Sequence, residues 1–114
     1  MRKSLASSVN TFYYYIGGGY KNFTGLGVDL IGKYLKYFGF GKKLGIDLSG
    51  EKAGLVPTRD WKEKTTGERW YVGDTYNLSI GQGGLLVTPL QINSLTATIA
   101  NGGTLFQPHL LNYL

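Results

Sequence analysis

The first apolar pattern in the chain predicts a short helix over residues 11–20. Apolar residues recur there at helical spacing behind a polar stretch, and a side-chain oxygen of Ser8 or Asn10 stands where a helix N-cap is expected. Three consecutive glycines follow at positions 17–19. Because each interior glycine costs about 1 kcal/mol relative to alanine, these glycines should weaken or end the helix and lead into a turn.

A second helix is predicted over residues 26–38, where the pattern is clearest. Its apolar positions form one stripe, which consists of Leu26, Leu30, Ile31, Tyr34, Leu35 and Phe38. Their spacing of i, i+4, i+5 and i+8 is typical of an amphipathic helix. Asp29, Lys33 and Lys36 mark the expected solvent face. Gly39 supplies the left-handed residue that commonly ends a helix.

The strongest local signal predicts that a third helix begins at Pro89. Proline suits the first helical position because its φ is fixed and it lacks an N–H. Thr88 before it can act as N-cap, and Gln91 can complete a capping box. The expected apolar stripe of this helix consists of Ile92, Leu95 and Ile99. Glycines 102–103 should end it, and residues 104–114 are predicted to be extended.

Between these helices, residues 40–84 divide into short pieces rich in glycine, lysine, aspartate and threonine. This pattern predicts an irregular connection with short helical turns. A disordered linker fits poorly, because large aromatic side chains are costly to leave in water and should pin the stretch to neighbouring structure. The side chains in question are Trp61, Trp70, Tyr71 and Tyr76.

Composition excludes several classes of function without selecting one. The chain has 114 residues, 42% of them hydrophobic and 17% charged, which predicts one domain with a core. It has no cysteine, so a disulfide framework, a thiol nucleophile and a thiolate zinc site are excluded. The net charge of +5 permits an anionic partner, but the basic residues are scattered, as on an ordinary solvated surface. No apolar run approaches the roughly 18 residues that would span a membrane.

Most candidate motifs have a plainer structural interpretation. Residues 27–34 nearly match a phosphate-binding loop, but Tyr34 stands where a magnesium-binding hydroxyl is needed and the same residues carry a helical stripe. His109 is the only histidine, and no other ligand residue lies near it in the sequence. We therefore predict neither a metal site nor a cofactor. Taken alone, Ser8-Val9-Asn10 is a capping arrangement before a helix.

Seven short blocks in a fixed order change the meaning of Ser8-Val9-Asn10. The blocks are Ser8-Val9-Asn10-Thr11-Phe12-Tyr13-Tyr14, Phe38-Gly39-Phe40-Gly41, Gly45-Ile46-Asp47-Leu48-Ser49-Gly50-Glu51, Pro57-Thr58-Arg59-Asp60-Trp61-Lys62, Trp70-Tyr71-Val72-Gly73-Asp74-Thr75, Ser79-Ile80-Gly81-Gln82-Gly83, and Thr88-Pro89-Leu90-Gln91 through Asn101-Gly102-Gly103. Together they resemble the transpeptidase domain of class B penicillin-binding proteins, most closely the penicillin-binding protein 2 branch of the cell-elongation machinery. The resemblance runs from Ser8 to about Leu111. One departure from the family is the longer spacing between Asn10 and the helix near Leu26.

The resemblance implies an α/β (α+β) fold of the β-lactamase/transpeptidase kind, with residues 1–114 as part of one domain. The predicted helices would belong to its helical part, and residues 104–111 would enter its antiparallel sheet. The family has three active-site motifs: Ser-x-x-Lys with the nucleophile, Ser-x-Asn, and Lys-Thr-Gly on a strand. Only the second is expected here, as Ser8-Val9-Asn10, because residues 64–67 read Lys-Thr-Thr-Gly and come too early. The chain is therefore expected to be an interior piece of the domain.

By resemblance, the implied function is that of a peptidoglycan D,D-transpeptidase, which cross-links stem peptides by acyl transfer from D-Ala-D-Ala and binds penicillin. Ser8 would relay a proton between the lysine of the nucleophile's motif and the leaving amine. Asn10 would hydrogen-bond the amide of the acyl side chain and help to fix the lysine. Without the nucleophile, the isolated 114 residues are expected to be inactive and to expose hydrophobic surface.

The implied partners are peptidoglycan stem peptides, β-lactam antibiotics and membrane proteins of the elongation machinery, with no nucleic acid and no cofactor. The implied location is the outer side of the bacterial cytoplasmic membrane, with the anchor outside these 114 residues. Two alternatives stay open from the residues alone. A small basic, aromatic-rich module could bind nucleic acid or an anionic polymer, and a non-catalytic remnant could act as a scaffold. The first alternative explains the charge and the aromatic residues, but it does not explain the ordered blocks.

Overall fold

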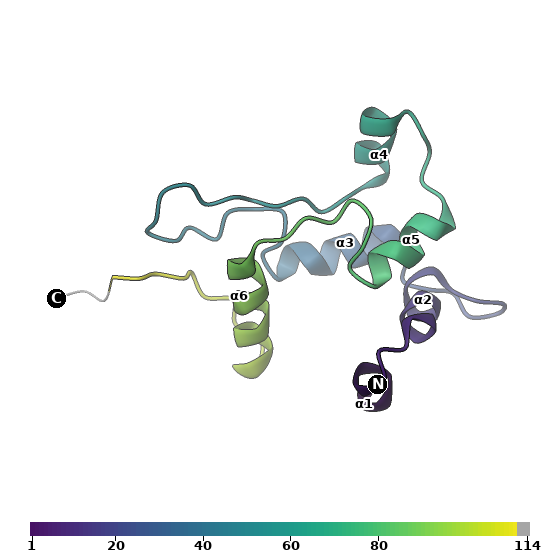
Figure 1. Cartoon of the computed structure of the whole chain (residues 1–114), viewed down its shortest axis with the longest axis horizontal. Helices are drawn as coiled ribbons and strands as arrows, with labels where there is room; N and C mark the ends of the chain where they lie inside the picture. Colours follow the sequence, from purple (N-terminus) through teal and green to yellow (C-terminus); the bar gives the residue numbers. More distant parts are fainter. Residues whose placement is uncertain (112–114) are drawn as a thin grey trace. The chain divides into compact units, whose positions relative to one another are not determined.

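The structure, a computed structural model, describes residues 1–111, and that part of the chain contains six helices (Figure 1). They are α1 (Arg2–Ala6), α2 (Asn10–Gly18), α3 (Gly27–Tyr37), α4 (Arg59–Thr66), α5 (Val72–Ser79) and α6 (Pro89–Ala100). Two isolated antiparallel bridges, Tyr20 with Phe23 and Leu55 with Leu86, are the only β pairing within residues 1–111. In these residues no helix has the length and apolar content needed to cross a membrane.

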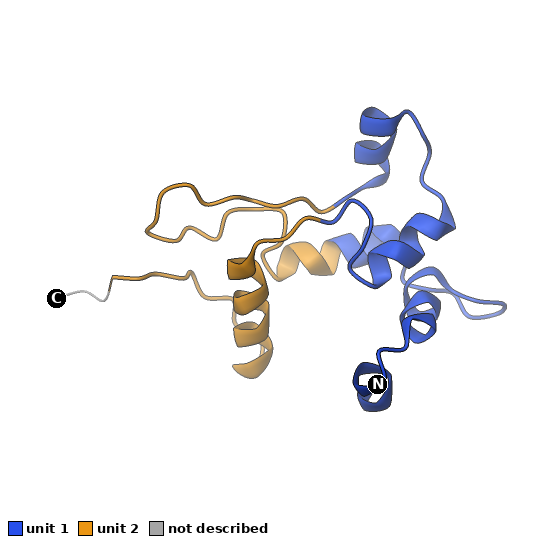
Figure 2. Ribbon diagram, viewed as in Figure 1, with its two compact units in different colours: residues 1–32, 57–85 blue, residues 33–56, 86–114 orange. Residues whose placement is uncertain are grey.

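The chain divides into two compact units, which Figure 2 colours separately. The first unit consists of Met1–Gly32 and Pro57–Leu85, and the second consists of Lys33–Val56 and the chain from Leu86 onward. The first unit holds α1, α2, α4 and α5, and the second holds α6 with long irregular segments. Each unit is therefore assembled from two stretches of sequence that lie far apart along the chain.

Glycines bring α2 and α5 together in the first unit. Gly17 is buried in α2, and a Cβ at this position would overlap the hydroxyl of Ser79 and lie 2.7 Å from its Cβ. Gly18 lies against the ring of Tyr76 in the same way. The hydroxyl of Tyr76 donates a hydrogen bond of 3.0 Å to the carbonyl oxygen of Gly19. The glycine run was predicted to end a helix, and it also permits close contact between two helices.

The three predicted helices are present as α2, α3 and α6, but the predicted N-cap of α2 is wrong. Val9 occupies the cap position without a side-chain cap hydrogen bond, and Asn10 is already the first helical residue. Ser8 instead closes the end of α1, a five-residue helix that the sequence pattern did not predict. Its five residues are too few to show an apolar period.

The predicted end of the second helix is confirmed at Gly39. Gly39 has φ +87°, in the left-handed region. Its N–H donates to the carbonyl oxygen of Lys36 at 3.0 Å, and the N–H of Phe40 donates to that of Leu35 at 3.1 Å. These two hydrogen bonds define a Schellman motif, which satisfies carbonyl groups that the last turn of α3 would otherwise leave unpaired.

Gln91 forms the polar centre of the second unit and is only 1% exposed. As predicted, it completes a capping box: its N–H donates to Thr88 Oγ1 at 3.2 Å, and its Oε1 accepts from the Thr88 N–H at 2.9 Å. Its Nε2 contacts three carbonyl oxygens, those of Gly39 at 3.3 Å, Lys42 at 3.0 Å and Ala53 at 2.8 Å. A single amide therefore holds the start of α6 to two irregular segments.

The predicted apolar stripes form, but much of their surface is exposed. On α6 the buried residues are Gln91, Ser94 and Thr98, whereas Ile92 and Ile99 are 46% and 66% exposed. On α3 the predicted solvent face is exposed as expected, yet the largest stripe residues are not buried either. The expectation of exposed hydrophobic surface is therefore confirmed for the described residues.

Residues 40–84 are more ordered than the sequence pattern predicted, because they contain two helices of eight residues each. Thr58 caps α4 by accepting a hydrogen bond of 3.1 Å from the N–H of Trp61. The predicted pinning to neighbouring structure is confirmed for Tyr76, which contacts Gly18 and Gly19 at the end of α2, whereas Tyr71 is 49% exposed. The two tryptophans make contacts within the stretch itself. The indole N–H of Trp70 donates to Thr75 Oγ1 at 2.8 Å, and the ring of Trp61 packs so closely on Gly84 that no Cβ would fit there.

The tail after α6 runs without strand pairing over residues 104–111, so the predicted entry into a sheet is not formed within the described part. The carboxylate of Asp47 holds this tail by accepting from the N–H groups of Leu110 at 2.7 Å and Leu111 at 2.9 Å. These hydrogen bonds, that of Leu111 foremost, lower the pKa of Asp47 because they favour its ionised form. The end of the predicted extended segment, residues 112–114, lies outside the described residues.

Candidate functional site

Ser8 occupies the turn between α1 and α2 in a left-handed backbone conformation, with φ +49°. Its N–H donates to the carbonyl oxygen of Leu5 at 3.2 Å, and the N–H of Val9 donates to that of Ser4 at 3.0 Å. The two hydrogen bonds form a second Schellman motif, in which Ser8 takes the position that glycine normally fills. The end of α1 therefore fixes the backbone of Ser8.

A serine at this position is energetically unfavourable, since a left-handed residue with a Cβ costs roughly 1–2 kcal/mol. Ser8 and Lys21 are the only residues other than glycine with positive φ in the described part of the chain. In that part no side-chain hydrogen bond engages the Ser8 hydroxyl, which is exposed. Ser8 thus combines an unfavourable backbone conformation with an exposed hydroxyl that makes no side-chain hydrogen bond within residues 1–111.

Ser8 and Asn10 line the same groove, which has a volume of about 300 Å³. The other lining residues are Ser4, Leu5, Tyr13, Ser79 and Ile80. The two predicted site residues are thus brought together on one surface of the first unit, at the start of α2.

Ser4 and Tyr13 belong to this groove although the sequence reasoning did not single them out. Ser4 is the buried residue of α1; its hydroxyl donates to the Met1 carbonyl oxygen at 2.6 Å and lies 3.4 Å from the hydroxyl of Tyr13. Tyr13 stands three residues after Asn10 on α2, a spacing that puts both side chains on one face. That spacing could have identified Tyr13, whereas α1 itself gave no sequence signal for Ser4.

The far wall of the groove comes from the end of α5. Ser79 reaches it because Gly17 lets α5 approach α2, and Ser79 is held there by a hydrogen bond of 2.6 Å to the carbonyl oxygen of Thr75. Ile80 follows as the C-cap residue of α5. A turn at Gly81-Gln82-Gly83 comes next, with both glycines left-handed and the N–H of Gln82 bonded to the carbonyl oxygen of Asn77 at 2.9 Å.

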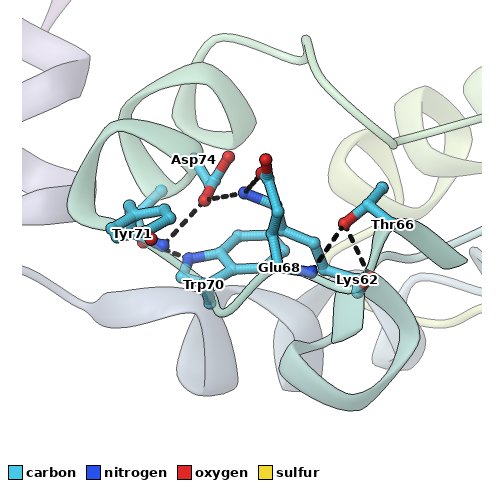
Figure 3. A network of polar contacts seen from close by, with 7 residues as sticks. Lys62, Thr66, Glu68, Trp70, Tyr71 and Asp74 are labelled. Carbon is cyan, nitrogen blue, oxygen red and sulfur yellow. Dashed lines mark hydrogen bonds and ion pairs between the residues drawn. The ribbon is translucent and has the colours of Figure 1, made fainter. Parts of the chain in front are cut away.

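A charged cluster fixes the start of α5 against α4 (Figure 3). Lys62 Nζ lies 2.7 Å from Asp74 Oδ2 and 3.6 Å from Glu68 Oε2, and the Lys62 side chain is 13% exposed. The same oxygen of Asp74 accepts the N–H of Tyr71 at 2.7 Å, which ties the carboxylate to the first turn of the helix. Lys62 Nζ also lies 5.1 Å from the centre of the Tyr71 ring.

This cluster shifts the pKa values of both of its central groups. The hydrogen bond to Asp74 raises the pKa of Lys62 above its ordinary value, against a smaller effect of burial. Burial by itself would raise the pKa of Asp74, but the Lys62 hydrogen bond, the Tyr71 N–H and the charge of Lys62 together lower it. The pair is therefore ionised at neutral pH and connects two helices of the first unit.

Three sequence patterns that mimic catalytic or phosphate-binding motifs lie in unsuitable structure. Residues 64–67, Lys-Thr-Thr-Gly, end α4, with Gly67 as its left-handed cap, and they form no strand. The near match to a phosphate loop lies within α3, where Gly32 is buried. Residues 49–52 spell Ser-x-x-Lys, but they form a turn and an irregular stretch of the second unit and begin no helix.

The groove can orient a ligand and relay a proton, but its own residues cannot supply a base. Its described lining offers the hydroxyls of three serines and a tyrosine and the amide of Asn10, with no carboxylate, lysine or histidine among them. A hydroxyl nucleophile needs an adjacent base to lose its proton. In residues 1–111, no three His, Cys, Asp or Glu side chains gather as a metal site would require. The lining residues thus suit an assisting role beside a nucleophile and a base.

The family is established by comparison with known proteins. Residues 1–114 match the family model of the penicillin binding protein transpeptidase domain. The chain therefore belongs to the penicillin-binding protein transpeptidase family, as the ordered blocks predicted. The comparisons give no support to the alternative of a basic module that binds nucleic acid.

Two curated relatives in this family carry the same name, peptidoglycan D,D-transpeptidase MrdA. The chain is 38% identical over 111 residues to peptidoglycan D,D-transpeptidase MrdA of Acinetobacter baumannii, across 97% of this chain and 16% of that protein. It is 38% identical over 109 residues to MrdA of Escherichia coli strain K12, across 96% and 16%. The chain thus spans about 16% of the length of these curated relatives. Their names refer to peptidoglycan, which gives a cell-envelope context.

Two solved structures share the fold. The penicillin-binding protein PBP2 of Helicobacter pylori, in its complex with MreC, is 39% identical with a TM-score of 0.81, over 94% of this chain and 19% of that chain. PBP2 of Pseudomonas aeruginosa in complex with WCK 5153 is 39% identical with a TM-score of 0.83, over 94% and 23%. The predicted β-lactamase/transpeptidase fold class, represented here mostly by its helical part, is confirmed.

Proposed function

We propose that this chain carries the Ser-x-Asn motif of a peptidoglycan D,D-transpeptidase, and that all of residues 1–114 belong to one transpeptidase domain. The observation that supports this most directly is the groove shared by Ser8 and Asn10, with Ser8 held in a strained turn. The family match over the whole chain and the names of the relatives support the same reaction.

In the proposed reaction, a serine outside these residues attacks the D-Ala-D-Ala bond of a stem peptide and forms an acyl-enzyme. The amine of a neighbouring stem peptide then takes the acyl group, so the exchange is divided into two easier steps. The Ser8 hydroxyl passes the proton from the nucleophile's lysine to the leaving amine. The Asn10 amide hydrogen-bonds the acyl side chain and fixes the lysine. A β-lactam imitates the donor and remains as a stable acyl group.

We also propose a cellular location and partners for this domain. The domain works on the outer side of the bacterial cytoplasmic membrane, with its anchor elsewhere in the protein, together with membrane proteins of the elongation machinery. The solved complex of the Helicobacter pylori relative with MreC supports a partner of this kind. The two units of the chain contain the helical segments that would be covered by the rest of such a domain, consistent with their exposed apolar stripes.

Acylation by a fluorescent penicillin tests the proposal on the protein encoded by the whole open reading frame. That frame should encode a Ser-x-x-Lys before Ser8 and a Lys-Thr-Gly after the α6 region. We expect Ser8→Ala to slow acylation by roughly 100-fold or more, the usual effect of removing a proton-transfer group. Ser7→Ala is the matched control, because Ser7 is an exposed neighbouring serine that does not line the groove. Equal rates for both variants would refute the role of Ser8.

Two further experiments test the role of Asn10 and the expected inactivity of the isolated chain. Asn10→Ala should slow acylation by about 10-fold or more, as expected when a hydrogen bond to a charged group is lost. Asn10→Gln retains the amide but displaces it, and should recover little. The purified 114-residue chain should not be labelled at all. Stable labelling of that chain, mapped to Ser8 by mass spectrometry, would contradict the assignment of Ser8 as a relay.

A further inference from the structure

A second hollow, of about 530 Å³, lies at the opposite end of the α2 and α5 helices in the same unit. The Ser8 groove includes Asn10 at the start of α2 and Ser79 at the end of α5. The second hollow instead includes Gly18 at the end of α2 and Val72 at the start of α5. Its volume lies in the range of small-molecule sites, roughly 300–1,000 Å³.

The loop after α2 forms one wall of this hollow. Tyr20 and Phe23 exchange two backbone hydrogen bonds of 3.0 Å, and Lys21 at the tip has φ +50°. Tyr20 also stacks on Tyr15 with ring centres 4.5 Å apart, although it is 48% exposed. The loop occupies the stretch where the spacing from Asn10 to the next helix is longer than the family pattern.

The chemistry of the lining favours an anionic ligand with a flat apolar face. Five aromatic rings line the hollow: Tyr20, Phe23, Trp70, Tyr71 and Tyr76. Its only charged lining residues within the described chain are Lys21 and Arg59. Arg59 pairs with Asp29 through Nε at 3.3 Å, and within the described residues no hydrogen bond engages its two terminal guanidinium nitrogens. Aromatic rings with polar edges suit a sugar ring, and the two cations suit a carboxylate.

We propose that this hollow binds the sugar-proximal, carboxylate-bearing part of a peptidoglycan strand whose stem peptide ends in the Ser8 groove. The proposal rests on the proposed transpeptidase function. The nine residues of α2 separate the two sites by about 13 Å, at 1.5 Å per residue. An extended peptide covers that distance in about four residues, at roughly 3.4 Å each. The hollow is thus within reach of the remainder of a strand bound in the Ser8 groove.

Binding of a soluble disaccharide-tetrapeptide to the full-length protein, measured by calorimetry, tests the inference. We expect Lys21→Asn and Arg59→Gln each to weaken binding by about tenfold, the effect of losing one charge-assisted hydrogen bond. Asparagine tolerates the left-handed conformation at position 21, and the exposed pair of Arg59 with Asp29 contributes little to stability. Lys64→Gln is the matched control, because Lys64 is an exposed cation on α4 outside the hollow.

Acylation by fluorescent penicillin separates this inference from the proposed function. A penicillin is too small to occupy both sites, so both hollow variants should be acylated at the wild-type rate. Wild-type binding by both variants, or equal binding of a ligand whose carboxylates are amidated, would overturn the inference while acylation still supported the transpeptidase. Absence of acylation in the unmodified protein would instead refute the proposed function.

Discussion

Replacing Ser8 by glycine separates the strain of the turn from the chemistry of the side chain. The left-handed conformation of Ser8 costs roughly 1–2 kcal/mol, and glycine adopts it without that cost. The greater loss of backbone entropy makes folding about 0.5–1 kcal/mol less favourable for glycine than for alanine. The balance predicts that Ser8→Gly raises the free energy of unfolding by roughly 0–1.5 kcal/mol, with a middle value near 1 kcal/mol. Ser8→Ala keeps the Cβ and its strain, and should stay within about 0.5 kcal/mol of the unmodified protein.

Thermal unfolding and penicillin acylation, measured on the same samples, make this prediction decisive. A gain of 1 kcal/mol corresponds to a rise in Tm of about 2–4 °C for a domain of 150–250 residues. Both variants should lose roughly 100-fold or more in acylation rate, because both lack the hydroxyl. The more stable variant should therefore be as inactive as the alanine variant. A glycine variant less stable than the alanine variant would refute the strain argument, whatever its activity.

Three further predictions concern the contacts that position the groove. Gly17→Ala should lower the free energy of unfolding by about 1–3 kcal/mol, although alanine is the better helix former, and Ser79→Gly should restore part of the loss, as measured by denaturant unfolding. Gln91→Leu should lower it by roughly 2–4 kcal/mol because buried carbonyl groups lose their donor, whereas an exposed substitution such as Gln82→Leu should have little effect. The free energy of unfolding, measured by tryptophan fluorescence over a range of pH, should show the contribution of the Lys62–Asp74 pair. The pKa of Asp74 is lowered and that of Lys62 is raised, so this contribution is lost as the pH falls through the pKa of Asp74 or rises through that of Lys62. Asp74→Asn should therefore reduce the loss of stability at acid pH, and the part due to Asp47 should remain.

Local chemistry explains why some elements were predictable. Thr88-Pro89-Leu90-Gln91 contains the cap, the fixed φ and the reciprocal hydrogen bond of a helix start within four residues, and α6 begins at Pro89. Gly39 likewise ends α3 through hydrogen bonds to residues within the preceding turn. Interactions of this short range leave their pattern in consecutive residues, so the sequence alone is enough to identify them.

At the N-terminal turn, the sequence identified the candidate site residues but not the backbone geometry that holds them. Ser-x-Asn before a helix predicted a cap, yet the structure uses Ser8 to end α1, a helix too short to show a period. The ordered blocks indicated the family independently of this error, because a series of residues in register needs no knowledge of backbone geometry. The left-handed conformation of Ser8 depends on hydrogen bonds to Ser4 and Leu5 and became visible only with the turn itself.

The sequence by itself determined the three longest helices, the family and the two residues, Ser8 and Asn10, that we assign to the site. The tertiary structure alone decided which surfaces meet. It brought Ser79 to the groove across the Gly17 contact, and it gave Gln91 partners that lie 38 to 52 residues away. The start and end of a helix depend on residues within one turn. The groove depends on distant segments, and α5 can approach α2 only because Gly17 has no side chain.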